Sequence, residues 1–284
     1  MTAAAAPPLD GTPSLPELIR RSRYEVIPLA GAEEQVFEHV PRDVTLTVTV
    51  SPAKGLEPSF LLAEALAQEG YGVVPHLAAR LVVDRTHLAE VVARFSGMGI
   101  RDVFVVAGDA DKAGAYEGAA ALLRDLHEIG HPFERIGITG YPETHPLIDD
   151  AVVRSAMAEK APYAHYIATQ ICFDPAVTVR WIDEVWAGGI RLPVYVGLPG
   201  AVERAKLLRV STRIGIGESV RYLRKHHDFV TRFFRPGGFS ADKLIRGLAP
   251  AIAGPDQKIS GFHIFTFNDL ADTEAWRQGM LGGG

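Results

Sequence analysis

The stretch "DRTHLAEVVARFSGMGIRDVFVVAGD", from Asp84 to Asp109, contains one helical segment followed directly by one strand-like segment. Asp84 or Thr86 can cap the start of the amphipathic helix, and Gly97 or Gly99 can end it. The apolar, β-branched run that finishes at Asp109 predicts a buried strand. The stretch therefore represents one unit of an alternating α/β pattern.

The same unit recurs on both sides of this stretch. Eight apolar runs rich in β-forming residues alternate with segments whose apolar residues have helical spacing. The runs are residues 23–28, 44–50, 71–76, 102–109, 135–142, 165–174, 192–199 and 261–267. A strand followed by a helix, eight times over about 250 residues, predicts a (β/α)8 TIM barrel. A doubly wound open sheet is the alternative, and eight runs without a break in composition favour the closed barrel.

The ends of this pattern set the expected domains. Residues 1–12 are small and Pro-rich, without a positive segment or a long apolar one, and predict a disordered tail rather than a signal peptide. Residues 13–284 predict a single catalytic barrel domain. Residues 201–260 interrupt the rhythm with two or three expected helices, so the barrel should carry extra helices before its eighth strand.

Composition narrows the class of protein. Hydrophobic residues are 47% and charged residues 22% of the chain, and the net charge is −5, as in an ordinary globular enzyme. The sequence has no basic cluster interleaved with aromatics for nucleic acid and no apolar run of about 20 residues for a membrane span. The single cysteine, Cys172, fits a reducing cytoplasm and is expected to be a small buried hydrophobe. Metal-hydrolase and serine-hydrolase motifs are absent from the sequence, so we expect no metal.

Polar residues within these runs are candidates for a site, because barrel enzymes work at the carboxyl ends of their strands. Glu25 lies mid-strand, where an unpartnered carboxylate is costly, so we expect it to be functional. Asp109 could equally cap the next helix. His76, taken alone, fits a core histidine, and Thr49 fits an ordinary strand residue. Gln170, as a buried amide, would need several hydrogen-bond partners and suits the edge of a flat heterocycle.

The last apolar run, "GFHIFTFND", ends in a polar cluster. Thr266, Asn268 and Asp269 are expected at the mouth of the barrel, beside the first strand and Glu25. His263, earlier in the run, is expected to be structural.

Six of these strand segments together resemble one family. "YEVIPLA", "VVPHLAA", "VVAGD", "GITGYPETHP", "YIATQICFD" and "FHIFTFND" resemble, in order and spacing, motifs of the methylenetetrahydrofolate reductases. The resemblance covers roughly residues 20–270. It implies a barrel enzyme of one-carbon metabolism and methionine biosynthesis that reduces 5,10-methylenetetrahydrofolate to 5-methyltetrahydrofolate. In the family FAD usually relays hydride from NAD(P)H.

The resemblance also implies residue roles on the substrate side. Glu25 matches the general acid, Asp109 the aspartate beside pterin and flavin, and Gln170 the glutamine that hydrogen-bonds the pterin. Thr169 and Asn268 are assigned to substrate binding. Burial in an apolar strand is expected to raise the pKa of Glu25.

On the cofactor side, Thr49, His76 and Tyr141 match positions that line the flavin site, and Gly108 is assigned with them. These positions are retained in this sequence. The expected partners are therefore folate and a nicotinamide nucleotide, either NADH or NADPH.

The charged contacts to FAD depart from the family pattern. Ala107 replaces an arginine, Glu203 replaces an aromatic, and Asp269 follows Asn268 where arginine is frequent. Glu159 falls at the spacing of a phosphate-binding lysine, and Lys160 is one place off. The chain thus resembles a divergent, flavin-independent branch that passes hydride directly from NADH or NADPH, without tightly bound FAD. A conventional FAD-dependent reductase and a non-catalytic folate-binding relative remain as alternatives.

Overall fold

A computed structural model describes residues 13–143, 145, 148–172, 174–201, 241–254 and 256–282. The expected N-terminal tail and residues 202–240 of the segment expected to hold extra helices, Glu203 among them, lie outside the described residues.

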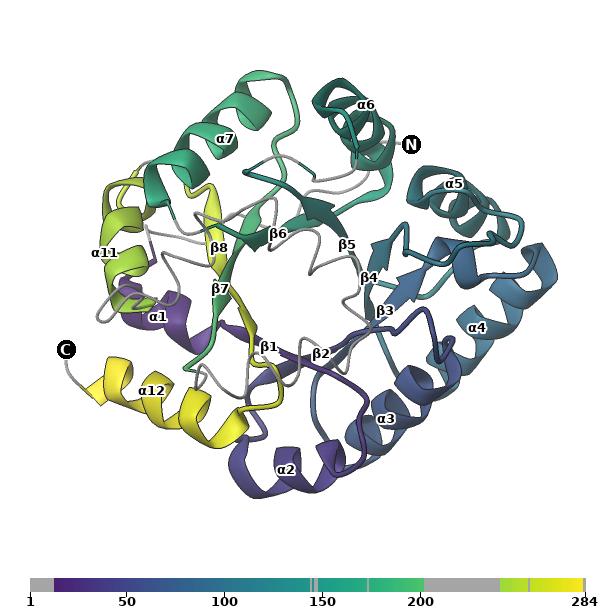
Figure 1. The fold of residues 1–284 in the computed structure, drawn as a ribbon, viewed down its shortest axis with the longest axis horizontal. Helices are drawn as coiled ribbons and strands as arrows, with labels where there is room; N and C mark the ends of the chain where they lie inside the picture. Colours follow the sequence, from purple (N-terminus) through teal and green to yellow (C-terminus); the bar gives the residue numbers. More distant parts are fainter. Residues whose placement is uncertain are drawn as a thin grey trace.

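Eight parallel strands close into a barrel in sequence order (Figure 1). They are β1 (Arg23–Val26), β2 (Thr45–Val48), β3 (Val73–Ala78), β4 (Asp102–Val106), β5 (Arg135–Gly140), β6 (Tyr166–Ile171), β7 (Val194–Pro199) and β8 (Ile259–Phe265). Closure occurs between β8 and β1, where Glu25 pairs with Phe265. The predicted TIM barrel is confirmed.

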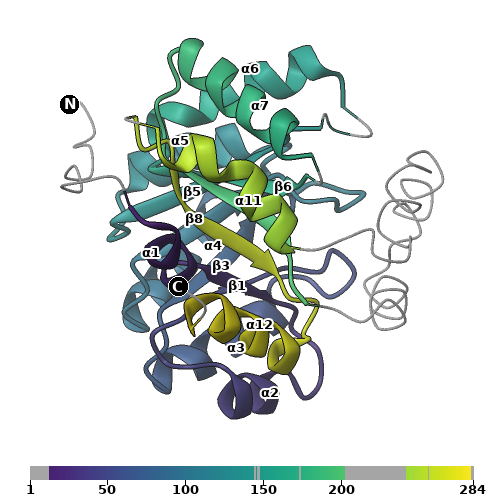
Figure 2. The same ribbon diagram turned by 90° about the vertical axis from the view of Figure 1, so that its left-hand side faces the viewer.

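Helices surround the barrel on its outer side (Figures 1 and 2). They are α1 (Leu15–Arg20), α2 (Ala32–His39), α3 (Glu57–Gln68), α4 (Arg85–Gly97), α5 (Ala119–Ile129), α6 (Asp150–Lys160), α7 (Pro175–Ala187), α11 (Ala241–Ile252) and α12 (Leu270–Gly282), with 3-10 turns η1 (Ala79–Leu81) and η2 (Ala161–Tyr163). Helix α11 is one of the helices expected within residues 201–260, and it packs on α7. Among the described residues, no helix is both long and apolar enough to cross a membrane.

The helix starts resolve two alternatives that the sequence left open. Asp84, rather than Thr86, caps α4, since its Oδ1 accepts a hydrogen bond from the backbone N–H of His87 at 2.8 Å. Helix α5 begins only at Ala119. Asp109 therefore does not cap α5, and the capping explanation for this residue is wrong.

The barrel interior is filled by inward-facing side chains of alternate strands. A cluster of five buried residues occupies it: Val74, Phe104, Tyr166, Ala168 and Tyr195. Gly137 makes room for the Tyr166 ring, because a Cβ at Gly137 would lie 2.2 Å from that ring. The interior is a packed core rather than a pore, so any site must lie toward one end.

A buried charge cluster closes the amino end of the barrel. The Arg23 guanidinium lies over the rings of Tyr166 and Tyr195, at 4.4 and 4.2 Å from their centroids. It pairs with Asp102 at 3.0 Å, and the Tyr166 hydroxyl donates to the same carboxylate at 2.9 Å. These contacts fill the amino end, which leaves the carboxyl end for chemistry.

Candidate functional site

Three titratable side chains meet inside the barrel, one each from β1, β3 and β8. His263 Nε2 lies 3.2 Å from Glu25 Oε2, within hydrogen-bond distance. His76 Nε2 lies 3.9 Å from the same oxygen. The Glu25 side chain is 16% exposed, while those of His76 and His263 are 6% and 3% exposed. We name Glu25, His76 and His263 the central triad.

The pKa of Glu25 is lowered, and the expectation of a raised pKa is wrong. Burial alone would raise it, as the sequence suggested, but the hydrogen bond with His263 and the charges of His76 and His263 outweigh burial. An apolar strand alone predicts a raised pKa, and the two histidines, which come from β3 and β8, reverse that direction. Glu25 is therefore ionised at neutral pH in the free protein.

His76 differs from His263 in its surroundings. Burial lowers the pKa of His76 to about 4, so its imidazole is neutral at physiological pH. Its Nε2 is buried and has no hydrogen-bond partner among the described residues. A buried polar atom of this kind normally has a partner. Its position beside Glu25 suits a bound water or a polar group of a substrate.

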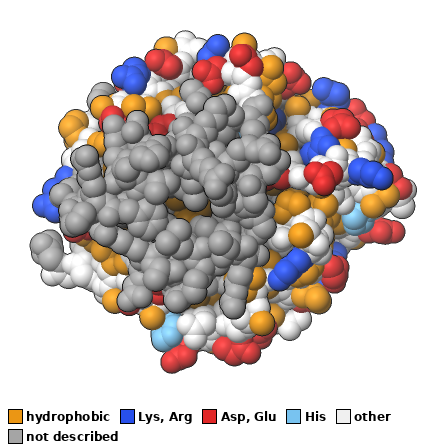
Figure 3. All heavy atoms as spheres, viewed as in Figure 1, with side chains coloured by type: hydrophobic (Ala, Val, Ile, Leu, Met, Phe, Trp, Pro, Cys, Tyr) orange, Lys and Arg blue, Asp and Glu red, His pale blue; other side chains and the backbone are white. Residues whose placement is uncertain are grey.

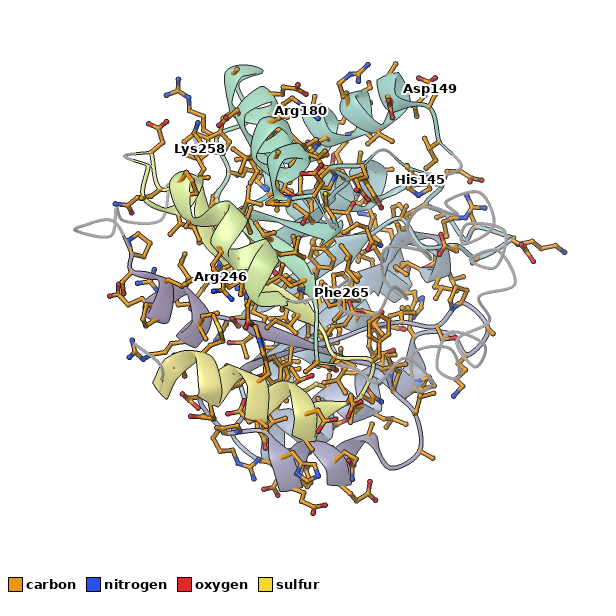
Figure 4. All side chains as sticks on the ribbon, turned by 60° about the vertical axis from the view of Figure 1, so that its left-hand side comes forward. His145, Asp149, Arg180, Arg246, Lys258 and Phe265 are labelled. Atoms are coloured by element: carbon orange, nitrogen blue, oxygen red, sulfur yellow. The ribbon has the colours of Figure 1, made fainter. Side chains whose placement is uncertain are left out.

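Aromatic rings border the central triad. The His76 ring lies 4.9 Å from Phe104, and the His263 ring lies 4.8 Å from Phe265 in an edge arrangement. Figure 4 shows Phe265 toward the carboxyl side of the barrel, on the side of His145, with Lys258 at the opposite side. The rings lower the local dielectric constant, which strengthens the interaction between Glu25 and its partners.

The segment after β8 fixes the end of β1. Asn268 accepts a hydrogen bond from the N–H of Ile27 and donates one to its carbonyl, both at 2.8 Å. Thr266 Oγ1 donates to the Glu25 carbonyl at 2.5 Å. Asn268 adopts a φ of +57°, a left-handed conformation that asparagine tolerates better than most residues. The predicted substrate ligand Asn268 thus has both ends of its amide engaged with the backbone beside Glu25.

A second polar group lies beyond β4 and β5. Asp109 is exposed and interacts electrostatically with Tyr141 and His145. The rings of Tyr141 and His145 lie 4.9 Å apart, edge to face. Burial raises the pKa of Tyr141, with a smaller opposing effect from a hydrogen bond with Thr139. The predicted residues Asp109 and Tyr141 are therefore neighbours.

Gly108 sits directly before Asp109 in a conformation that requires glycine. Its φ is +84°, and an added Cβ would lie 3.0 Å from the Cβ of Ala78 on β3. The predicted cofactor residue Gly108 thus lets the chain after β4 pass close to β3.

Strand β6 carries two predicted site residues, one buried and one exposed. Thr169 is buried, and its Oγ1 accepts a hydrogen bond from the Gly197 N–H at 2.8 Å, where the β6–β7 register shifts. Gln170 is exposed, so the premise that its amide is buried is wrong.

Thr49, a predicted cofactor residue, is half-buried just beyond β2, and its carbonyl accepts a hydrogen bond from Ser59 Oγ at 2.7 Å. No substrate contact follows from these positions alone.

Lys160 supplies a buried cation that the sequence analysis set aside. Its Nζ donates to Thr139 Oγ1 at 3.3 Å, and the residue is 7% exposed. Burial lowers the pKa of its ammonium to about 8. The spacing of the family motif puts Glu159 at the position of the phosphate-binding lysine. In the structure, the side chain that points to β5 is that of the next residue, Lys160.

Two further properties concern metals and surface charge. Within the described part of the chain, no group of three or more His, Cys, Asp or Glu side chains could hold a metal ion. Cys172 is buried, and burial raises the pKa of its thiol to about 11, so it is not a ready nucleophile. Figure 3 shows acidic and basic side chains intermixed around the described rim of the face viewed as in Figure 1.

The geometry of the central triad suits two kinds of chemistry. A carboxylate with a histidine donor and an unpartnered neutral histidine can move a proton or stabilise a cation. The sequence predicted Glu25 and His76 as site residues and His263 as a structural residue, whereas His263 contacts Glu25 directly. The signal for His263 was its inward phase on β8, opposite Arg23 on β1, which becomes useful only once barrel closure is known.

Comparison with known proteins gives the chemistry its context. A family model described as methylenetetrahydrofolate reductase matches residues 29–214. Methylenetetrahydrofolate reductase 1 of Schizosaccharomyces pombe is 27% identical over 109 residues, which are 35% of this chain and 18% of that protein. The aligned part is thus less than a fifth of that relative.

One solved structure shows a weak likeness to this chain. It is described as a phosphonomutase from Burkholderia cenocepacia J2315, with a TM-score of 0.45 and 14% identity over 75% of this chain and 98% of that chain. A likeness this low carries no argument about function.

The range matched by the family model contains Asp109 and Gln170 but ends before β8 and begins after Glu25. Of the central triad, His76 alone lies within the matched range. Because the family model covers residues 29–214 of 284, this chain belongs to the methylenetetrahydrofolate reductase family.

Proposed function

We propose that the protein reduces 5,10-methylenetetrahydrofolate to 5-methyltetrahydrofolate, taking hydride directly from NADH or NADPH. The observation that carries this proposal is the buried carboxyl group of Glu25 beside two histidines inside the barrel of a chain from this family. The balanced reaction consumes one hydride and one proton. The C–N10 bond of the bridging methylene breaks, N10 gains the proton, and the resulting N5-iminium carbon accepts the hydride.

Glu25 has two tasks in this scheme. As a carboxylate in a site of low dielectric constant, it stabilises the iminium cation that forms when the ring opens. Held in place by the 3.2 Å contact with His263, it also takes up the proton from water and passes it to N10, directly or through a water. His76 stays neutral, because its pKa is about 4, and its free Nε2 can hold that water.

For hydride transfer, the main task of the protein is to position the two reacting rings. The nicotinamide and pterin rings must stack at about 3–3.5 Å with the reacting carbons aligned. Asp109, in the loop after β4, and Gln170, near the end of β6, are both exposed and are assigned here to the donor and acceptor edge of the pterin. We assign three residues to the nicotinamide side: Thr49, Gly108 and Tyr141. Tyr141 is the neighbour of Asp109.

The described residues fit a flavin pyrophosphate poorly. Beside the loop after β4, the guanidinium of Arg80 already donates to three backbone carbonyls and a carboxylate. Ala107 offers no charge there. This supports direct hydride transfer, and no step of the mechanism is routed through FAD.

One observation favours a second candidate, the conventional FAD-dependent reductase. Lys160 is a buried ammonium whose hydrogen-bond partner is a hydroxyl, and among the described residues it forms no ion pair. A phosphate would stabilise such a cation. Lys160 could then substitute for the missing contacts to FAD.

Anaerobic oxidation of NADH by methylenetetrahydrofolate, measured with and without added FAD, separates the two candidates. The proposal predicts turnover by purified protein that lacks visible flavin absorbance, and no increase on addition of FAD. Turnover that requires FAD would establish the second candidate. A protein that binds folate but oxidises neither nucleotide under any of these conditions would be a non-catalytic relative.

A further inference from the structure

The loop between β4 and α5, residues 107–118, is fastened to the segment that follows β3. Arg80 N donates to the Ala107 carbonyl at 3.0 Å, and Gly114 N donates to the Arg80 carbonyl at 3.0 Å. Ala115 N donates to the Val83 carbonyl at 2.9 Å. Asp109 lies within this loop. Its position therefore depends on the loop and not on β4 alone.

The Arg80 side chain adds a second set of contacts. Its Nε donates to the Ala110 carbonyl at 2.8 Å, and its Nη2 donates to the Asp111 carbonyl at 3.2 Å. Its Nη1 donates to the Glu117 carbonyl at 3.4 Å and also to the Glu117 carboxylate. The Arg80 side chain is 22% exposed; its bond to Ala110 is part-buried, whereas those to Asp111 and Glu117 are exposed. Two of the three carbonyls belong to the residues directly after Asp109.

The backbone of the loop packs directly against the segment that follows β3. A Cβ at Gly114 would lie 2.1 Å from the carbonyl oxygen of Val82. The Gly108 backbone passes Ala78 just before Asp109. Tyr116, further along, is buried, and its hydroxyl donates to Asp125 on α5 at 2.8 Å. Both halves of the loop are therefore fixed by groups of the protein itself.

We infer that Arg80 is a positioning residue, which holds Asp109 at the barrel mouth before any ligand binds. A planar guanidinium can serve several carbonyls in different directions at once, which a lysine ammonium cannot match in geometry. Arg80 touches neither substrate nor cofactor in this account and acts through the loop. Its effect on catalysis rests on the proposed function, whereas its effect on the loop does not.

Trypsin cleavage after Lys112, an exposed residue of the loop, tests the loop directly. Where the loop opens and closes faster than it is cut, cleavage follows the open population. Arg80→Ala should accelerate cleavage at Lys112 at least about tenfold, and Arg80→Lys should give an intermediate rate, because charged hydrogen bonds to three carbonyls are lost or reduced. The thermal midpoint of each variant shows whether the whole protein is affected.

Two matched variants serve as controls. Arg94→Ala removes a guanidinium of similar exposure, 30%, that pairs with Glu57 and Glu64 away from this loop. Glu117→Ala removes only the carboxylate partner, which is 83% exposed and therefore contributes little. Both should be cleaved at the wild-type rate. Wild-type cleavage in folded Arg80→Ala, or equal acceleration by Arg94→Ala, would overturn the inference.

A double-mutant cycle tests the link to catalysis. Arg80→Ala should lower kcat/KM for methylenetetrahydrofolate about tenfold, mostly through KM, but should have little further effect in an Asp109→Asn background. Additive effects would show that Arg80 does not act through Asp109. If the wild-type protein lacks reductase activity, the proposed function fails, while the proteolysis result still decides the role of Arg80 in the loop.

Discussion

At Glu25, burial and two histidines act in opposite directions on one carboxyl group. Burial raises its pKa, while the His263 hydrogen bond and the charges of both histidines lower it, and the net direction is downward. In the proposed reaction, Glu25 delivers the proton while His263 holds its carboxylate in place.

Replacing Glu25 tests its role in the reaction. Glu25→Gln keeps the size and hydrogen bonding of the side chain but cannot carry the proton or stabilise the cation. We expect kcat to fall about 10²–10⁴-fold, with folate still bound. Steady-state kinetics and equilibrium binding of 5-methyltetrahydrofolate measure the two effects. Unchanged kcat would remove Glu25 from the mechanism.

Replacing His263 tests the origin of the lowered pKa. His263→Leu leaves burial as the main influence, so the pKa of Glu25 should rise and its carboxylate should protonate at a higher pH than in the wild type. Infrared titration of the carboxyl band, assigned by its loss in Glu25→Gln, measures this change. His263→Gln, which can still donate a hydrogen bond, should raise the pKa less. A pKa unchanged in His263→Leu would contradict the account.

At the scale of elements, the ends of strands place the functional side chains. The sequence predicted the eight strands because β-branched apolar runs report a buried strand wherever it occurs. It overestimated their length at β4, which ends at Val106, so that Asp109 belongs to a loop. The partners of Glu25 were not predictable in the same way. The contact with His263 depends on the register between β1 and β8, which only closure of the barrel establishes.

The two hydrogen bonds between the Asn268 amide and the Ile27 backbone, here called the clamp, should stabilise the contact between the end of β1 and the segment after β8. Asn268→Ala removes both hydrogen bonds and places alanine at a φ of +57°, so we expect a loss of about 1–3 kcal/mol in the free energy of unfolding. Asn268→Gly accepts this φ without strain and isolates the contribution of the amide. Urea unfolding of both variants gives the values. Wild-type stability in Asn268→Gly would mean that the clamp contributes nothing.

Thr169 provides an independent element-scale prediction at the β6–β7 irregularity. Thr169→Val leaves the Gly197 N–H buried without an acceptor and should cost about 1–3 kcal/mol, whereas Thr169→Ser should cost much less. Thermal and urea unfolding compare the two variants. Equal stability of the Val and Ser variants would show that the hydroxyl acceptor is unimportant.

At the scale of the whole molecule, α12 closes the ring of helices beside β1 (Figure 1). The hydroxyl of Tyr24 on β1 donates to Glu274 at 2.8 Å, and Arg277 pairs with the same carboxylate at 2.8 Å. Arg277 is 2% exposed. A polar network this deep was not predictable from sequence, because charged residues on a terminal helix normally indicate a solvated face.

This network should make stability depend on pH in a defined direction. Burial raises the pKa of Glu274, but hydrogen bonds from Arg277, Gln278 and Tyr24 lower it overall. Its contribution is therefore complete above the unfolded-state pKa of about 4.3 and is lost as pH falls through the lower folded-state value. Glu274→Gln should cost about 3–5 kcal/mol at pH 7, because Arg277 remains buried without its partner.

Urea unfolding at a series of pH values checks this prediction. The difference in stability between wild type and Glu274→Gln should shrink as the pH falls below about 4.3. A difference that stays constant with pH would show that the ionised carboxylate is not the stabilising group.

The central claim concerns the path of the hydride, and isotope transfer tests it most directly. NADH carrying deuterium at C4 of the nicotinamide, on the transferred face, is incubated anaerobically with methylenetetrahydrofolate and the protein. Direct transfer predicts that the deuterium appears undiluted in the methyl group of 5-methyltetrahydrofolate, because it never meets solvent. Transfer through a reduced flavin, whose N5 hydrogen exchanges with water, would dilute the label, and that result would contradict direct hydride transfer.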